Sequence, residues 1–486
     1  MFAIGDVLVN DDQPPGLRRA LGTPKIVFLV VAAAAPLVAM AGTVPLSIGV
    51  GNGPGIPGAY LVATVTLLLF SVGYAAMSRH ITRGGGFYTY IARGLGRPPA
   101  AAGAVFALVA YNGLVAALAG GIGYFLSSGL GLPVPWWVLS LAGVAVMGAL
   151  GYRSIDLSAK VLAVLMVCEI AVLLVFDVAV IAARGADAFT LTSFAPSTVF
   201  SGAPGVAFMF AFGSFAGFEA AALYAEETPD PVRTVPRATY AAVLVIGVFY
   251  LFTSWMMVGA VGASRVRAEA AKDSGTFFLN LSAAQLGDAA SSVFGLLIIT
   301  SVFASLLSAH NASSRYLFAL GRDRLLPHAL GRVHARHASP YVASLVQTAF
   351  TVVVVAAFAI GGLDPYRQLV TVMSGLSTLG IILLQTFASI AIVVYFRRRG
   401  DRRYARTLVA PVLGCLGMLT ATALLLRNFA TLADTRAVFI NSLPYVVLVV
   451  AVAAACYTLW LRRADAGRYA GLGNGADDAA RTRGDA

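Results

Sequence analysis

Residues 211–231 read AFGSFAGFEAAALYAEETPDP, and this stretch decides how the chain is interpreted. An apolar segment that could cross a membrane as one helix contains Gly213 and Gly217 and then a carboxylate, Glu219. Each glycine lowers helix stability by about 1 kcal/mol relative to alanine, and a charge at the bilayer centre costs at least about 2.5 kcal/mol. A helix that only anchors a protein gains nothing from either feature. A broken helix beside an ionisable group is typical of the midplane binding site of a secondary transporter.

The composition indicates an integral membrane protein. Of the 486 residues, 59% are hydrophobic and only 12% are charged, whereas soluble domains carry about 25% charged residues. The apolar runs are continuous rather than alternating, which favours helices over a β-barrel. We therefore expect an all-α fold with twelve spans, near 26–48, 58–78, 99–128, 136–151, 159–183, 203–223, 238–262, 290–314, 342–361, 368–396, 408–428 and 440–463.

The net charge of +12 follows the membrane topology. With a cytosolic N-terminus, 27 of the 34 Lys and Arg fall in segments on the inner side, which is the positive-inside bias. We therefore expect both termini in the cytosol of a bacterium, with the chain in its inner membrane and no nucleic-acid partner. Three cysteines lie in predicted spans without paired spacing, so neither a disulfide nor a metal site is expected.

The first span is also interrupted. Pro36 and Pro45 each remove a backbone donor and disfavour helix at the preceding residue. A proline kink alone is common in membrane helices, but the pairing with the break at 213–217 favours a ligand site. Freed N–H groups at the start of a half-helix would receive a carboxylate.

Each of the two interrupted spans is the first in a group of five. This arrangement predicts an inverted repeat of five plus five helices, followed by two more helices. The expected division is a cytosolic segment 1–25, a first repeat 26–183, a second repeat 203–396, two closing helices 408–463 and a disordered tail 464–486.

Three carboxylates lie inside predicted spans. Glu219 follows the second break, where it either faces a central cavity or holds unwound backbone to a neighbouring helix. Glu169 is deeper in its span and is a candidate proton carrier, although a buried, hydrogen-bonded structural role is the alternative. Asp177 is nearer the outer edge, where it could extend to water.

Hydroxyl side chains share one face of the eighth span, Ser301 and Ser305 among them. They could line a cation site or could join helices through hydrogen bonds. Tyr111 in the third span is similarly ambiguous. No Ser-His-Asp, HExxH or CxxC pattern occurs, so we do not expect an enzyme or a cofactor other than a coupling ion, H⁺ or Na⁺.

Three motifs resemble the amino acid–polyamine–organocation superfamily. They are FGSFAGFEAAALYAEETPDP in the sixth span, TRGGGFYTY after the second, and NASSRYLFALGRDRLLPHALGRVHARHASP in and after the eighth. The resemblance covers roughly 26–400. It implies a LeuT-type fold with a central site between helices one, three, six, eight and ten.

The resemblance also implies site residues. Relatives bind the substrate through unwound backbone, which corresponds here to Val38–Gly42 and to Gly213–Gly217. Helix one departs from the common G-x-G form because Ala39 and Ala41 replace the glycines. Some proton-coupled relatives carry a Lys in helix five, and Glu169 takes that position. Taken with the residues singled out above, the candidate substrate residues are Val38, Ala39, Met40, Ala41, Gly42, Gly213, Ser214, Phe215, Gly217, Glu219 and Tyr111; the coupling candidates are Glu169, Ser301 and Ser305.

The expected function is uptake of an amino acid or related amine by alternating access, coupled to H⁺ or Na⁺. An amino acid or amine exchanger without ion coupling is the alternative. A non-transporting membrane sensor is disfavoured because no sizeable soluble segment is present. Neither the substrate nor the oligomeric state follows from the sequence.

Overall fold

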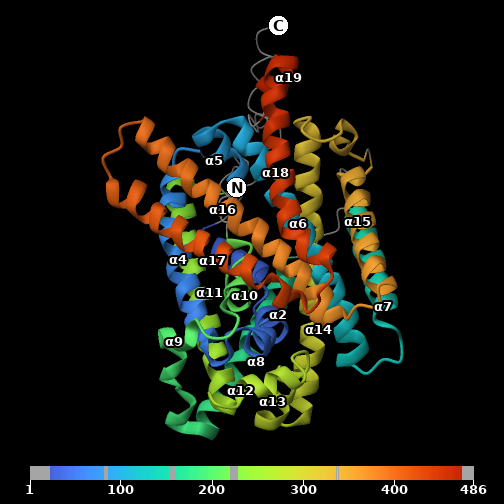
Figure 1. The fold of residues 1–486 in the computed structure, drawn as a ribbon. Coiled ribbons are helices and arrows are strands. Elements are labelled where there is room, and N and C mark those ends of the chain that lie inside the picture. The colour runs from blue at the N-terminus through green and yellow to red at the C-terminus, as the bar shows by residue number, and fades with distance from the viewer. Residues whose placement is uncertain are drawn as a thin grey trace, which may run out of the picture.

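A computed structural model describes residues 22–81, 86–153, 159–218, 228–334, 336–337 and 339–472. Within these ranges the chain forms helices and turns and no strands. Long helices run roughly along one direction of the molecule, and short helices cover its two ends (Figure 1). The expected all-α membrane fold is confirmed at this level.

The helices of the first half begin with a segmented helix. It consists of α1 (Thr23–Ala33), α2 (Pro36–Gly42), α3 (Val44–Leu46), η1 (Ser47–Asn52) and η2 (Gly53–Gly55). After it come α4 (Ile56–Ser78), α5 (Gly86–Leu95), α6 (Arg97–Tyr124), η3 (Phe125–Gly129), α7 (Trp136–Tyr152) and α8 (Ala159–Arg184). The connection to the next half contains η4 (Gly185–Ala188), η5 (Leu191–Phe194) and α9 (Pro196–Val199).

The second half begins with α10 (Pro204–Gly213). It continues through α11 (Pro231–Val261), α12 (Val266–Lys272), α13 (Phe277–Leu286), α14 (Asp288–Arg322), η7 (His328–Gly331), α15 (Tyr341–Ile360), η8 (Pro365–Val370) and α16 (Thr371–Arg398). The chain closes with η9 (Ala405–Val409), α17 (Ala410–Ala433), α18 (Val438–Ala464) and α19 (Ala466–Gly471).

Ten helices within the described ranges are long and apolar enough to cross a membrane. The other two expected spans coincide with shorter apolar helices, α7 with 17 residues and α10 with 10. In the sixth expected span, 203–223, α10 ends at Gly213 and turns follow over 214–217, while residues 219–227 lie outside the described part. The chain is therefore a multi-pass membrane protein.

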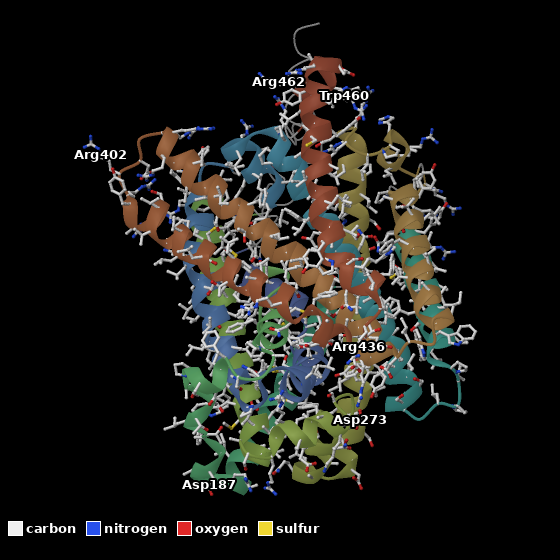
Figure 2. All side chains as sticks on the ribbon, viewed as in Figure 1. Asp187, Asp273, Arg402, Arg436, Trp460 and Arg462 are labelled. Atoms are coloured by element: carbon white, nitrogen blue, oxygen red, sulfur yellow. The ribbon has the colours of Figure 1, made fainter. Side chains whose placement is uncertain are left out.

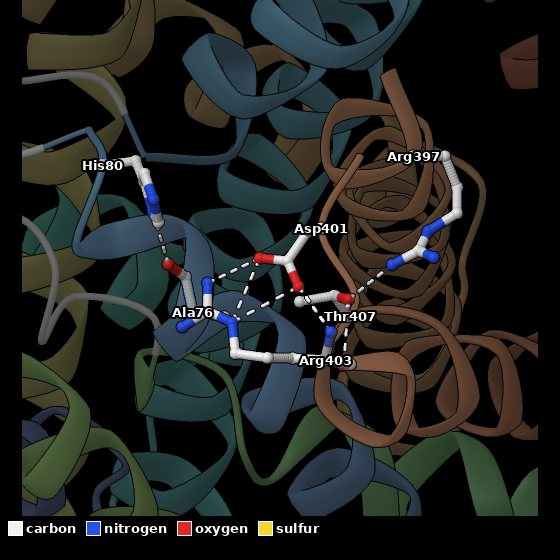
Figure 3. Close-up of polar contacts among 6 residues, drawn as sticks. All are labelled: Ala76, His80, Arg397, Asp401, Arg403 and Thr407. Carbon is white, nitrogen blue, oxygen red and sulfur yellow. Dashed lines mark hydrogen bonds and ion pairs between the residues drawn. The ribbon is translucent and has the colours of Figure 1, made fainter. Parts of the chain in front are cut away.

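The two ends of the molecule differ in charge. Arg402 and Arg462 project at the end that carries α5 and α19, whereas Asp187 and Asp273, together with Arg436, lie towards the end that carries α12 and α13 (Figures 1 and 2). We call these the arginine-rich end and the α12–α13 end. The side chain of Arg403 pairs with Asp401 in the loop between α16 and α17 (Figure 3). These hydrogen bonds lower the pKa of Asp401 to about 2.

Residues 464–486 are not entirely without structure, in contrast to the disorder expected from their composition. The Asp465 side chain accepts from the Arg468 amide and caps α19. Arg97, at the start of α6, donates from Nε to the Leu472 carbonyl at 2.9 Å and lies over the Tyr469 ring. Residues 473–486 lie outside the described part.

Small residues let α6 and α16 pack backbone to backbone near the centre. A Cβ on Gly380 would lie 2.5 Å from the Phe106 carbonyl oxygen, and one on Gly113 would lie 2.9 Å from the Met373 carbonyl oxygen. Between them, the Ser377 hydroxyl donates to the Ala110 carbonyl at 2.7 Å. This close packing of small residues is typical of membrane helix pairs, and it fixes the framework beside the interrupted helices.

Gly380→Ala should therefore lower thermal stability, because the added methyl has only main-chain atoms to displace. We expect a loss of about 1–3 kcal/mol, as for other overpacked sites, measured as a lower melting temperature of the purified protein in detergent. The matched control is Gly295→Ala on α14, where the nearest atom to the new methyl is 4.0 Å away. An equal melting temperature for the two variants would show that α6 and α16 do not pack this closely.

Candidate functional site

The first helix is interrupted at Ala34 and Ala35. Helix α1 ends at Ala33 and α2 begins at Pro36, and between them Ala35 has φ 46° and ψ 73°, the left-handed conformation. The cause is Pro36, which lacks an amide hydrogen and disfavours right-handed helix at the residue before it. The resemblance to the superfamily implies unwound backbone over 38–42, but these residues form α2. That prediction is wrong in register, because the interruption directly precedes the proline.

Side chains from two other helices satisfy backbone groups freed at this break. The Leu37 amide donates to Glu169 Oε2 at 3.2 Å, and Glu169 is only 5% exposed. The Tyr250 hydroxyl on α11 donates to the Ala34 carbonyl at 3.0 Å. Because an unpaired peptide group inside a membrane costs several kcal/mol, these two contacts allow the helix to stay open.

The second break follows α10. The helix ends at Gly213, and turns lead to Phe218, with Gly217 at φ 102°, a conformation that only glycine adopts without strain. The Ser214 hydroxyl donates to the Phe210 carbonyl at 2.8 Å and lies 2.9 Å from the Tyr60 hydroxyl. The predicted glycine break is therefore present, while Glu219 lies outside the described residues.

A pair of buried tyrosines brings the two breaks together. The rings of Tyr60 on α4 and Tyr250 on α11 meet edge to face, with centroids 5.8 Å apart, and both side chains are fully buried. The Phe215 ring, within the second break, lies 6.3 Å from the Tyr250 ring. Tyr250 thus touches one break with its hydroxyl and the other with its ring.

The remaining candidate residues lie on α2, α14 and α6. Four residues of α2, namely Ala39, Met40, Ala41 and Gly42, are buried, and Val38 is half-buried. Ser301 is buried on α14, which packs against both α2 and α8, the helix that carries Glu169. Ser305 is half-buried one turn further on. Tyr111 on α6 packs against Tyr316, with ring centroids 5.9 Å apart.

The α12–α13 end of α2 is closed by aromatic side chains. The Tyr366 hydroxyl donates to the Gly42 carbonyl at 2.8 Å, and its ring stacks on Tyr124 at 4.6 Å. Tyr366 is 3% exposed. Sequence reasoning missed this cluster and the pair Tyr60 and Tyr250. The one available signal was that a buried phenol needs a hydrogen-bond partner.

Asp177 does not extend to water, so that interpretation of its position is wrong. It is 1% exposed, and its Oδ2 accepts from the Thr253 hydroxyl on α11 at 2.9 Å. Helices α8 and α11 cover it because they pack side by side along this stretch.

Comparison with known proteins decides the family. The family model described as amino acid permease matches residues 21–454. The chain belongs to the amino acid permease family. The match spans both interrupted helices and the framework around them, and it confirms the resemblance drawn from the sequence motifs.

Two relatives illustrate the range of this family. The chain is 27% identical over 425 residues to the branched-chain amino acid permease BcaP of Bacillus subtilis, covering 82% of this chain and 85% of the relative. It is 25% identical over 404 residues to the low-affinity putrescine importer PlaP of Escherichia coli K12, covering 79% and 83%.

A solved structure shares the fold of this permease-family chain. The crystal structure of a manganese transporter from Eremococcus coleocola superposes with a TM-score of 0.57 and 14% identity. The superposition covers 95% of this chain and all of the other. At that identity the likeness concerns the fold alone.

Tyr250→Phe should weaken the first break, because the Ala34 carbonyl loses its donor while the ring packing remains. We expect a loss of about 1–3 kcal/mol, the cost of leaving a buried acceptor unpaired, measured by thermal unfolding of the purified protein. Tyr445→Phe on the exposed face of α18 is the matched control. If the two variants unfold alike, the hydrogen bond to Ala34 contributes nothing to stability.

Proposed function

We propose that the chain is a secondary transporter that imports an amino acid or a related amine across a bacterial inner membrane by alternating access. The observation that carries this proposal is the pair of interrupted helices, held against one another by Tyr60 and Tyr250. Interrupted helices meeting near the middle of the fold offer backbone groups and helix ends to a zwitterion. The family membership and the two relatives support the same class of substrate.

The proposed architecture is twelve spans in a five-plus-five inverted repeat followed by two helices. The first repeat corresponds to 26–183 and the second to 203–396, with the breaks opening each of them. The concentration of arginines at one end supports placing that end, and both termini, in the cytosol. The α12–α13 end then faces outward, and the contact of Tyr366 with Gly42 closes the outer entrance in this state.

The substrate site is proposed to lie along both breaks. From the first helix it takes Val38–Gly42, together with the break at Ala34 and Ala35 that precedes them. From the sixth it takes Gly213–Gly217 and Glu219, and Tyr111 borders the site from α6. Because relatives act on a neutral amino acid in one case and a diamine in another, Glu219 is compatible with either class.

Coupling is proposed to run through Glu169. Its carboxylate accepts from the Leu37 amide at the start of α2, so adding a proton weakens the contact between α8 and the half-helix. Ser301 and Ser305 border the same space from α14 and belong to the proposed coupling region. A sodium ion bound among these oxygens is the competing form of coupling.

Uptake by the purified protein in liposomes tests the function. Radiolabelled leucine and putrescine are offered with an inward proton gradient, with an inward sodium gradient, or with neither. Saturable accumulation driven by one of the gradients supports import and names the coupling ion. Uptake that requires internal substrate and ignores both gradients shows exchange, and a protein that binds substrate without moving it disproves transport.

Glu169→Gln should abolish proton-driven accumulation while keeping substrate counterflow, because the amide cannot carry a proton yet fills the same space. The matched control is Glu269→Gln on α12, a carboxylate that pairs with Lys272 at the surface. Unchanged accumulation by the Glu169 variant would show that this residue has a structural role and does not carry the coupling proton.

Glu219→Gln should reduce both accumulation and counterflow, since its carboxylate is proposed to lie beside the substrate. The folded yield, measured by size-exclusion chromatography, should stay close to that of the unmodified protein. Normal transport by this variant would remove Glu219 from the substrate site.

A further inference from the structure

A second buried carboxylate on α8 has no role in the function proposed above. Asp177 lies between α8 and α11 with 1% of its surface exposed, and Thr253, which donates to its Oδ2 at 2.9 Å, is fully buried. The other carboxyl oxygen, Oδ1, is buried and has no hydrogen-bond partner among the described residues. One hydroxyl is therefore the whole polar environment shown for this group.

No opposite charge compensates Asp177. Among the described residues it makes no ion pair, and the nearest cation along its own helix is Arg184, whose Nε donates to the Gly259 carbonyl at 3.3 Å. Helices α2 and α13, which also pack against α8, carry no charged residue.

The remaining neighbours of α8 carry titratable groups that are engaged elsewhere or lie towards the helix ends. On α11, Tyr250 is bonded to Ala34. The other titratable or charged groups on these elements are Lys25 on α1, Asp187 on η4, Arg233, Arg237 and Tyr240 on α11, and Asp288, His310, Arg315, Tyr316 and Arg322 on α14.

An ionised Asp177 is costly in this arrangement. Its negative charge would be spread over two oxygens, one of which has no donor among the described residues, at a position where only 1% of the residue is exposed. A buried charge without a partner is far more expensive than a buried neutral polar group. The packed arrangement of α8 and α11 therefore requires a proton on this carboxyl.

Asp177 and Glu169 connect α8 to two different helices. They lie eight residues apart, or roughly 12 Å along the helix axis. Glu169 bonds the first half-helix at Leu37, whereas Asp177 bonds α11 at Thr253. The two carboxylates thus join one helix to two separate elements.

We propose that Asp177 is a second exchangeable proton-binding site, whose proton is held while α8 and α11 are packed together and is released when they separate and water enters. Because binding and conformation are linked reciprocally, the proton at Asp177 favours the packed arrangement, and alkaline pH favours separation. The proposal rests on the proposed function, because alternating access requires helices to move apart, and we assign part of that movement to α8 and α11; the proton site itself can be measured without transport.

Infrared difference spectroscopy tests the proton site. The full-length protein in lipid is titrated from acid to alkaline pH, and the carbonyl band of protonated carboxyl groups is followed. Glu169→Gln serves as the parent so that only one carboxylate buried in α8 remains. A titrating band should be present in the parent, absent after adding Asp177→Asn, and unchanged after adding Asp187→Asn, an exposed control on η4.

Thr253→Val supplies an independent variant. Removing the one donor that the described residues offer to Asp177 destabilises the ionised form more than the protonated form, so the band should titrate at higher pH, by about one unit. Only an ionisable Asp177 can produce this shift. The Thr253→Val variant therefore tests the proposal even if Asp177→Asn fails to fold. The proposal is overturned if the titrating band persists in Asp177→Asn. It is also overturned if Thr253→Val does not change the pH at which the band titrates.

Spin labels test the linked movement. Cysteines placed at Val178 on α8 and Val248 on α11, both exposed, carry the labels after the three native cysteines are replaced. The distance between labels should lengthen with rising pH in the otherwise unmodified protein and stay constant in Asp177→Asn. A pH-independent distance in both would show that Asp177 only accepts a hydrogen bond from Thr253. Absence of transport with these results intact would refute the proposed function and leave the proton site standing.

Discussion

The need to satisfy backbone groups inside a membrane governs this structure. An interrupted helix exposes amides and carbonyls that lipid cannot hydrogen-bond, so each break requires side chains aimed at it from elsewhere. Glu169 and Tyr250 supply an acceptor and a donor at the first break, and Tyr60 contacts Ser214 at the second. The positions of these polar residues within apolar helices follow from this requirement.

The same requirement divides the molecule into parts of different rigidity. The contact between α6 and α16 is made of main-chain atoms and small residues, so it leaves little freedom for relative movement. The contacts at the breaks are single hydrogen bonds made by the side chains of Glu169, Tyr250 and Tyr60, and one of these side chains is a carboxylate. A framework of the first kind beside a centre of the second kind is what alternating access requires.

The sequence predicted the membrane class, the two breaks and the family, because apolar length, prolines and glycines act locally. Gly217 has a positive φ angle, as expected for a glycine at a helix break, and Pro36 interrupts the first helix. The implied position of the first break was wrong because the resemblance placed the unwound segment after Pro36, whereas the steric conflict acts on the residue before the proline. Asp177 was misjudged because depth along a helix was read without knowing which helix covers it. The partners Tyr60 and Tyr250 come from distant positions, and no local pattern joins them.

The backbone of Ala35 has a conformation that alanine disfavours, and the neighbouring Pro36 places the first break there. An alanine in the left-handed region costs about 1–2 kcal/mol, and α1 and α2 on either side are rich in helix-forming alanine. Because Pro36 acts whichever partners are present, the interruption remains when the hydrogen bonds of Glu169 and Tyr250 break. The segment at Ala34 and Ala35 then acts as a joint whose position is fixed by the proline, while the bonded partners set the angle between α1 and α2.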